Sequence, residues 1–145
     1  MPKHSERQTS PYTPEQLFSL VADVAKYPEF LPWCRAARIL ERKENEFLAE
    51  LVISFAHHSG RYTSRVSLDR PHEINVTMVR GPFEYLTNHW RFTSKEEGGT
   101  SIDFALDFTF RSKILEKLIG SLFAKATQKM VTAFKVRADE LYGNK

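Results

Sequence analysis

The sequence predicts a single α+β domain, in which a curved antiparallel sheet of seven strands wraps around one long C-terminal helix. Three observations support this prediction. Apolar and polar residues alternate over much of residues 35–111, turn residues interrupt the alternation, and an apolar stripe with helical spacing runs over residues 113–142. Because an alternating strand buries one face and exposes the other, the sheet needs a cover, which the helix can supply. The chain, residues 1–145, has the size of one ordinary domain.

The N-terminal region begins with a predicted strand at residues 3–10, followed by one or two short helices. Thr13 can cap the first helix, Pro14 fits its first turn, and Gln16 can close a capping box. The apolar residues that follow keep helical spacing. We expect this helix to end near Tyr27, because the proline after it disfavours helix in the preceding residue.

Residues 27–34, Tyr-Pro-Glu-Phe-Leu-Pro-Trp-Cys, are apolar and stiff, and we call them the proline segment. Its two prolines exclude one continuous helix, so we expect only a short helical turn at residues 29–31. An apolar, irregular segment has to be covered by the fold or by a bound molecule. We expect Trp33 to anchor the segment in the core, while Phe30 and Leu31 face the entrance of a cavity.

Six further strands are predicted between residues 35 and 111, joined as a meander of hairpins. The clearest alternation covers residues 102–110, where apolar side chains share one face. Glycines, prolines and polar residues typical of turns separate the strands. The expected turns are Ser59-Gly60, Arg70-Pro71-His72, Gly81-Pro82 and Gly98-Gly99.

The last predicted element is a helix over residues 113–142 that ends at Gly143. Gly120 in its middle allows a close approach to the sheet or a local bend. Lysines flank the apolar stripe, as in helices that lie on anionic membranes, so transient contact with a membrane surface is one expectation. These lysines are Lys113, Lys117, Lys125 and Lys129.

Three stretches of the sequence resemble one protein family. They are Phe18–Cys34, which reads FSLVADVAKYPEFLPWC, then Gly81–Leu86 followed by Trp90 and Phe92, and finally Leu115–Gly143. On these residues the chain resembles the START-like, helix-grip superfamily and, within it, the polyketide-cyclase/coenzyme Q-binding branch. The resemblance covers residues 3–143.

The resemblance implies a helix-grip fold with a cavity under the C-terminal helix. The resemblance to coenzyme Q-binding START-domain proteins implies that the chain binds ubiquinone, or another polyprenyl quinone, as a ligand without catalysis, in support of respiratory electron transport. Ribosome-association toxins of the same branch equally imply binding to the large ribosomal subunit and a block on subunit joining. Aromatases and cyclases that act on polyketides are a weaker alternative, because the chain shows no convergent acid–base set.

Pockets for apolar ligands are lined by aliphatic and aromatic side chains with a few polar anchors. Asn88, in an otherwise apolar strand face, can bond a ligand carbonyl or simply a neighbouring side chain. Both interpretations stay open, as does a filled core without a cavity. The candidate ligand-binding residues are Phe30, Leu31, Trp33, Phe83, Asn88, Trp90, Phe92, Phe104, Leu106, Phe108, Leu118, Leu122, Phe123 and Met130.

Other site chemistries find little support. The five histidines lack the spacing of metal ligands, so we expect no metal site and no cofactor. Cys34 lies in an apolar setting, where a thiol packs as a small hydrophobe and has a raised pKa. Most aromatic residues alternate onto the strand face that the helix should cover, so we expect no DNA partner.

Charge and targeting signals give broader expectations. The net charge is +3 with dispersed positive residues, which is typical of a solvated surface. Residues 1–10 lack the apolar core of a signal peptide, and no apolar run is long enough to span a membrane. We expect a cytoplasmic protein, or one peripheral to the inner membrane. The best candidates for contact with ribosomal RNA are Arg61, Arg65, Arg80 and Arg91.

Overall fold

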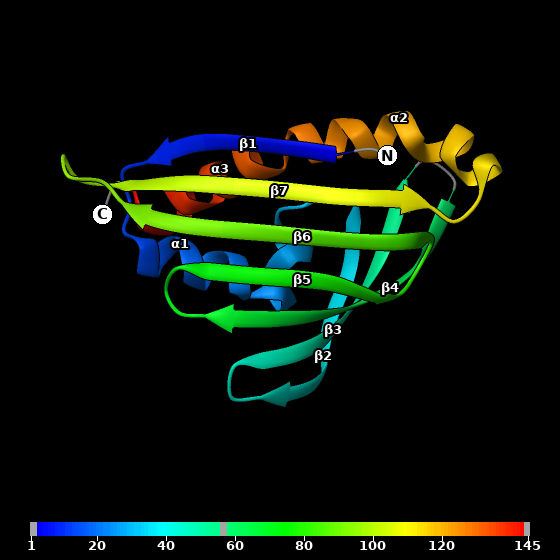
Figure 1. Ribbon diagram of the computed structural model, residues 1–145, viewed down its shortest axis with the longest axis horizontal. Coiled ribbons are helices and arrows are strands. Elements are labelled where there is room, and N and C mark those ends of the chain that lie inside the picture. The colour runs from blue at the N-terminus through cyan, green and yellow to red at the C-terminus, as the bar shows by residue number, and fades with distance from the viewer. Residues whose placement is uncertain (1–2, 56–57, 144–145) are drawn as a thin grey trace.

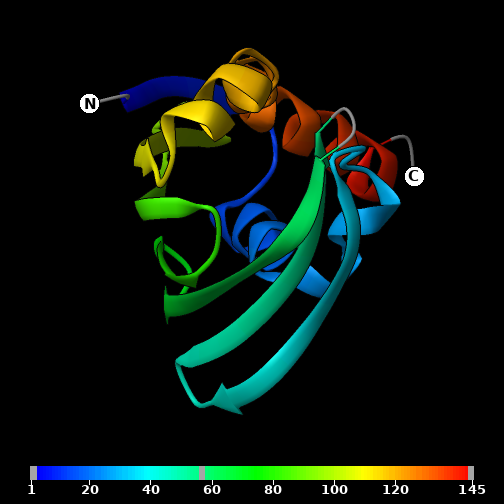
Figure 2. The same ribbon diagram turned by 90° about the vertical axis from the view of Figure 1, so that its right-hand side faces the viewer.

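The computed structural model describes residues 3–55 and 58–143, which form a seven-stranded antiparallel sheet that curves around the helices (Figures 1 and 2). The strands are β1 (Lys3–Ser10), β2 (Cys34–Lys43), β3 (Glu46–Phe55), β4 (His58–Asp69), β5 (Glu73–Arg80), β6 (Phe83–Ser94) and β7 (Thr100–Phe110). Their order in the sheet is β1-β7-β6-β5-β4-β3-β2. The predicted α+β class, the seven strands and the meander are therefore confirmed.

The first helix begins as its sequence predicts. In α1 (Pro14–Ala22), the Thr13 hydroxyl accepts a hydrogen bond from the Gln16 N–H at 3.1 Å, and the Gln16 side chain accepts one from the Thr13 N–H at 3.0 Å. A 3-10 helix, η1 (Val24–Glu29), follows. The expected short turn thus lies earlier in the chain than residues 29–31, and it contains the first proline of the proline segment.

Two of the turns show why glycine occupies them. Gly98 and Gly99 adopt φ values of +99° and +82°, which favour glycine, and a Cβ at Gly99 would lie 2.5 Å from the Ser10 carbonyl oxygen. The expected turn at Ser59-Gly60 is wrong, because both residues pair with β3 inside strand β4. Residues between Phe55 and His58 join the two strands and lie outside the described part of the chain.

The long C-terminal helix is instead two helices, α2 (Lys113–Gln128) and α3 (Met130–Tyr142). The break falls at Lys129, with φ −99° and ψ 0°, and not at Gly120, where an added Cβ would meet only Glu116 Cγ at 3.7 Å. The helix divides because it covers two surfaces: α2 packs on β3 and β7, whereas α3 packs on α1.

The proline segment is fixed to the core by a different residue from the one expected. Leu31 is 1% exposed, whereas Trp33 and Phe30 are half-buried. Arg137 of α3 holds the outer side of the segment, because its guanidinium lies 2.5 Å from a Glu29 carboxylate oxygen and 5.2 Å from the centre of the Phe30 ring. The expected roles of Trp33 and Leu31 are therefore exchanged.

We predict that Leu31→Ala lowers the free energy of unfolding by about 2–5 kcal/mol, because it removes a fully buried side chain from a packed core. The matched control is Leu40→Ala on β2, where the side chain is 43% exposed and the expected change is within about 0.5 kcal/mol. Urea unfolding of both variants measures the difference. Equal losses would contradict the anchoring role of Leu31.

Candidate functional site

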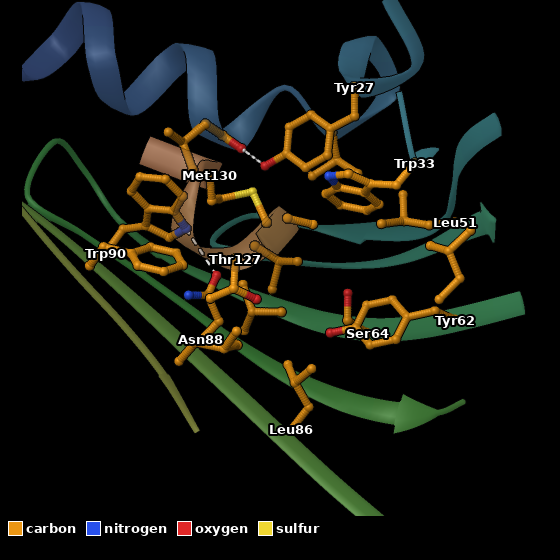
Figure 3. Close-up of a pocket in the computed structure, with 18 of the residues that line it drawn as sticks. Tyr27, Trp33, Leu51, Tyr62, Ser64, Leu86, Asn88, Trp90, Thr127 and Met130 are labelled. Carbon is orange, nitrogen blue, oxygen red and sulfur yellow. Dashed lines mark hydrogen bonds between the residues drawn. The ribbon is translucent and has the colours of Figure 1, made fainter. Parts of the chain in front are cut away.

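A cavity of about 110 Å³ lies between the concave face of the sheet and the helices that cover it (Figure 3). Its walls are almost entirely apolar, since aliphatic and aromatic side chains supply most of the lining. The lining residues are Val21, Val24, Tyr27, Trp33, Leu51, Ile53, Phe55, Tyr62, Ser64, Val66, Ile74, Val76, Phe83, Leu86, Asn88, Trp90, Phe104, Leu106, Phe123, Ala126, Thr127, Met130 and Phe134.

The structure brings together many of the residues that the sequence suggested for a ligand site. The candidates that line the cavity are Trp33, Phe83, Asn88, Trp90, Phe104, Leu106, Phe123 and Met130. Those that lie elsewhere are Phe30, Leu31, Phe92, Phe108, Leu118 and Leu122. Of these, Leu31, Phe92 and Phe108 are buried in the surrounding core, whereas Leu118 and Leu122 point outward from α2 into solvent.

Sequence reasoning missed much of the opposite wall. Strands β3 and β4 contribute Leu51, Ile53 and Tyr62 to the cavity. Their signal was present in the sequence, because residues 47–55 alternate between apolar and polar as clearly as the last strand does. Ala126 and Thr127 were also missed, since neither residue type distinguishes a cavity wall from an ordinary helix face.

Asn88 bonds neighbouring protein groups. Its side-chain N–H donates to the Ala105 carbonyl at 2.9 Å, and its carbonyl oxygen accepts from the Trp90 indole N–H at 2.9 Å (Figure 3). After these two bonds the amide still has one N–H that can donate and one carbonyl lone pair that can accept a hydrogen bond. Asn88 is therefore fixed in position by the protein and keeps one N–H for a second acceptor.

Two tyrosines add polar atoms to the cavity wall. Tyr27 donates its hydroxyl hydrogen to the Val21 carbonyl, and the Tyr62 side chain lies beside Ser64 (Figure 3). Burial raises the pKa of both phenols. Both hydroxyls are thus neutral over the whole physiological range, and the cavity holds no charge from them.

Aromatic rings close one end of the cavity. The Phe134 ring meets Tyr27, Phe30 and Trp90 edge to face, with centroids 5.3, 5.2 and 5.1 Å away. At the other end, Phe123 lies against a second ring group, with its centroid 4.7 Å from that of Phe108. Ring contacts at both ends therefore define the walls of the cavity in this form.

The lining limits what the site can do chemically. None of the lining residues is an aspartate, glutamate, histidine, lysine or arginine. A site without such groups has no general acid or base with a pKa near neutrality. Its volume is below the roughly 300–1,000 Å³ of ordinary ligand pockets, so this form suits a single ring-sized apolar group.

The arginines considered for RNA contact lie on the outer side of the sheet, and most are paired. Arg61 lies 3.3 Å from Glu50, Arg65 lies 2.7 Å from Glu46, and Arg91 lies 3.1 Å from Glu73. Arg80 is exposed, and within the described residues no ion pair involves it. These pairs neutralise the sheet face only in part, because Arg61 shares Glu50 with Arg38, and among the described residues of this group Arg80 is the arginine without an ion pair.

Comparison with known proteins gives relatives over nearly the whole chain. Residues 10–135 match the family model described as polyketide cyclase / dehydrase and lipid transport. The ribosome association toxin RatA of Rickettsia prowazekii is 44% identical over 135 residues, which cover 90% of this chain and 92% of that protein. The mitochondrial coenzyme Q-binding protein COQ10 homolog B of Xenopus laevis is 31% identical, over 97% of this chain and 59% of that protein.

A solved structure supports the same fold. The Zhui aromatase/cyclase from Streptomyces sp. R1128 superposes with a TM-score of 0.83, over 95% of this chain and 93% of that one. Sequence identity between the two is 17%, so the likeness concerns the fold alone. The described residues contain no helix long and apolar enough to cross a membrane.

We predict that stability falls as pH rises from 9 to 11, partly through Cys34. Burial raises the pKa of this thiol from 9.0 to about 11, so the unfolded chain loses its proton first and ionisation favours unfolding within that window. Below pH 9 the thiol is protonated in both the folded and the unfolded chain, so its full contribution to stability is present. Thermal unfolding midpoints should therefore decline less steeply with pH in Cys34→Ala than in the unchanged protein. Parallel curves would contradict a buried, protonated thiol.

Proposed function

Because the chain belongs to the polyketide cyclase/dehydrase and lipid transport family, we propose that it binds a polyprenyl quinone such as ubiquinone, without catalysis, in the cavity beneath α2 and α3. The observation that carries this proposal is the apolar, ring-lined cavity between sheet and helices. A quinone head group is a flat ring with carbonyl acceptors, and it suits walls of aromatic and aliphatic side chains with a few hydrogen-bond donors.

The polar atoms of the wall fit such a head group. Asn88 keeps one amide N–H after bonding Ala105, and Thr127 and Ser64 supply hydroxyl groups from other parts of the wall. One or two of these donors are enough for a quinone carbonyl. The remaining contacts come from rings such as Trp90 and Phe123, which offer large apolar area.

The prenyl tail requires more space than the cavity holds in this form. About 110 Å³ accommodates a ring but not a ring with a long chain attached. We therefore propose that α2 moves outward when the tail enters, because α2 forms one wall through Phe123 and Ala126 and its outer face is exposed.

A non-catalytic role is supported by the lining itself. Proton transfer to a polyketide needs an acid or base near the substrate, and the lining supplies two tyrosines whose raised pKa keeps them neutral. We propose binding and presentation of the ligand, in support of respiratory electron transport, as the function of this cavity.

We predict that protein purified from a quinone-producing host yields a prenyl quinone on extraction into organic solvent, detected by mass spectrometry. Ala126→Phe, which fills the cavity from α2, should reduce the bound quinone about tenfold or more. The matched control is Ala124→Phe on the exposed side of the same helix, which should retain the quinone. Absence of any prenyl lipid from the unchanged protein would sink the proposal.

A second candidate function is association with the large ribosomal subunit and a block on subunit joining. The observation that favours it is the name of the more similar relatives, since ribosome association toxins reach 44% identity and the coenzyme Q-binding relative 31%. The charge pattern supports a limited contact, because most arginines of the sheet face already pair with glutamates.

We predict for this second function that the protein co-sediments with large ribosomal subunits at low salt and dissociates as salt rises. Arg80→Ala should weaken this association, whereas Arg91→Ala, whose guanidinium pairs with Glu73, should have a smaller effect. Ala126→Phe should leave it unchanged, which separates the ribosomal role from the cavity. Protein that stays at the top of a low-salt gradient would exclude this function.

A further inference from the structure

The outer face of α2 exposes large apolar side chains. Ile114, Leu118 and Leu122 are 72%, 53% and 38% exposed. They are spaced by four residues, so they form one row along the same side of the helix. Exposed apolar residues that occur singly need no explanation, but a contiguous row on one element indicates a surface that is covered by a partner.

Lysines accompany this row. Lys117 and Lys125 lie three residues from Ile114 and Leu122, which places them beside the row on the same side of the helix. Lys113 and Lys129 stand at its two ends, and Glu116 is the acidic residue of the helix. In the described chain the lysines with ion pairs are Lys3, Lys26 and Lys95, so the α2 lysines are uncompensated.

The position of α2 leaves this face accessible. The helix lies along the upper margin of the molecule in both views, with no other element above it (Figures 1 and 2). Its inner side carries the buried Ile119 and the cavity residues Phe123 and Ala126. One helix therefore separates the cavity from the exposed row of apolar and basic residues.

We propose that the outer face of α2 docks on the surface of an anionic lipid bilayer. A helix of this kind lies in the interface, with apolar side chains among the acyl chains and lysines at the head groups. A nucleic acid would satisfy the lysines but leave Ile114 and Leu118 in water. A second copy of the chain would bring the same lysines against one another in a symmetric contact. An anionic bilayer satisfies both kinds of side chain.

The proposal goes beyond the cavity and does not depend on what the cavity holds. It also places the cavity next to the bilayer, because the helix that would contact the bilayer is the one that covers the cavity. A ligand dissolved in the bilayer would reach Phe123 and Ala126 once α2 shifts, without crossing bulk water.

The test is co-sedimentation of the full chain with vesicles of two compositions, phosphatidylcholine alone and phosphatidylcholine with an equal part of phosphatidylglycerol. We expect binding to the anionic vesicles that is about tenfold or more tighter than to the neutral ones and that weakens with added salt. Equal binding to both, or no binding to the anionic vesicles, would overturn the proposal.

Matched variants locate the surface. Leu118→Glu and the double change Lys117→Glu with Lys125→Glu should each weaken vesicle binding about tenfold or more. Val136→Glu is the control, because Val136 on α3 is 53% exposed, as Leu118 is, but lies outside the row. Thermal unfolding checks that all variants are folded. Unchanged binding of the α2 variants, or an equal loss in Val136→Glu, would overturn the assignment.

A further pair of measurements separates the proposals. Ala126→Phe should bind anionic vesicles normally although it loses quinone. The quinone proposal and the bilayer proposal can therefore be contradicted independently of each other. If the double lysine change removes ribosome association and leaves vesicle binding intact, the outer face of α2 binds the ribosome and the lipid proposal is wrong.

Discussion

The packing of Phe134 joins the parts of the molecule on which the cavity depends. Its ring meets Tyr27 and Phe30 of the proline segment and Trp90 of β6 at centroid distances of 5.1–5.3 Å. Edge-to-face contacts of this kind contribute about 0.5–1.5 kcal/mol each beyond burial. Helix α3, the irregular segment and the middle of the sheet are thus held by one side chain, and three of these rings also form the cavity wall.

Much of the fold could be predicted because local rules and global packing agree. Local sequence signals agree with the final structure at three places: the capping box of Thr13 and Gln16 begins a helix, the alternation along β7 forms a strand, and the glycines at 98–99 form a turn. The break at Lys129 could not be predicted, since lysine is a good helix former and the apolar spacing continues through it from Ala126 to Met130 and Phe134. The turn at Ser59-Gly60 failed because strand pairing with β3 outweighed turn propensity.

The site was predictable where periodicity fixes the direction of a side chain. Phe104 and Leu106 lie in the cavity wall because strand alternation places them on the covered face. Helical spacing was less informative, since the apolar stripe of α2 is wider than its buried side and includes the exposed Leu118. The proline segment has no periodicity at all, so the sequence could not distinguish Leu31, which is buried, from Trp33, which lines the cavity.

The two covers of the cavity differ in how firmly they are attached. The proline segment is fixed by Leu31 in the core and by Arg137, which contacts both Glu29 and Phe30. Helix α2 is joined to α3 through a residue outside helical geometry and leaves half its surface in water. We therefore expect α2 to be the cover that opens first in native-state hydrogen exchange, against the contacts of the Phe123 ring, whose centroid lies 4.7–5.8 Å from those of Phe55, Phe83, Phe108 and Phe110. Opening as proposed would then cost the inner contacts of α2 alone, while α3, the sheet and the proline segment stay folded around the space.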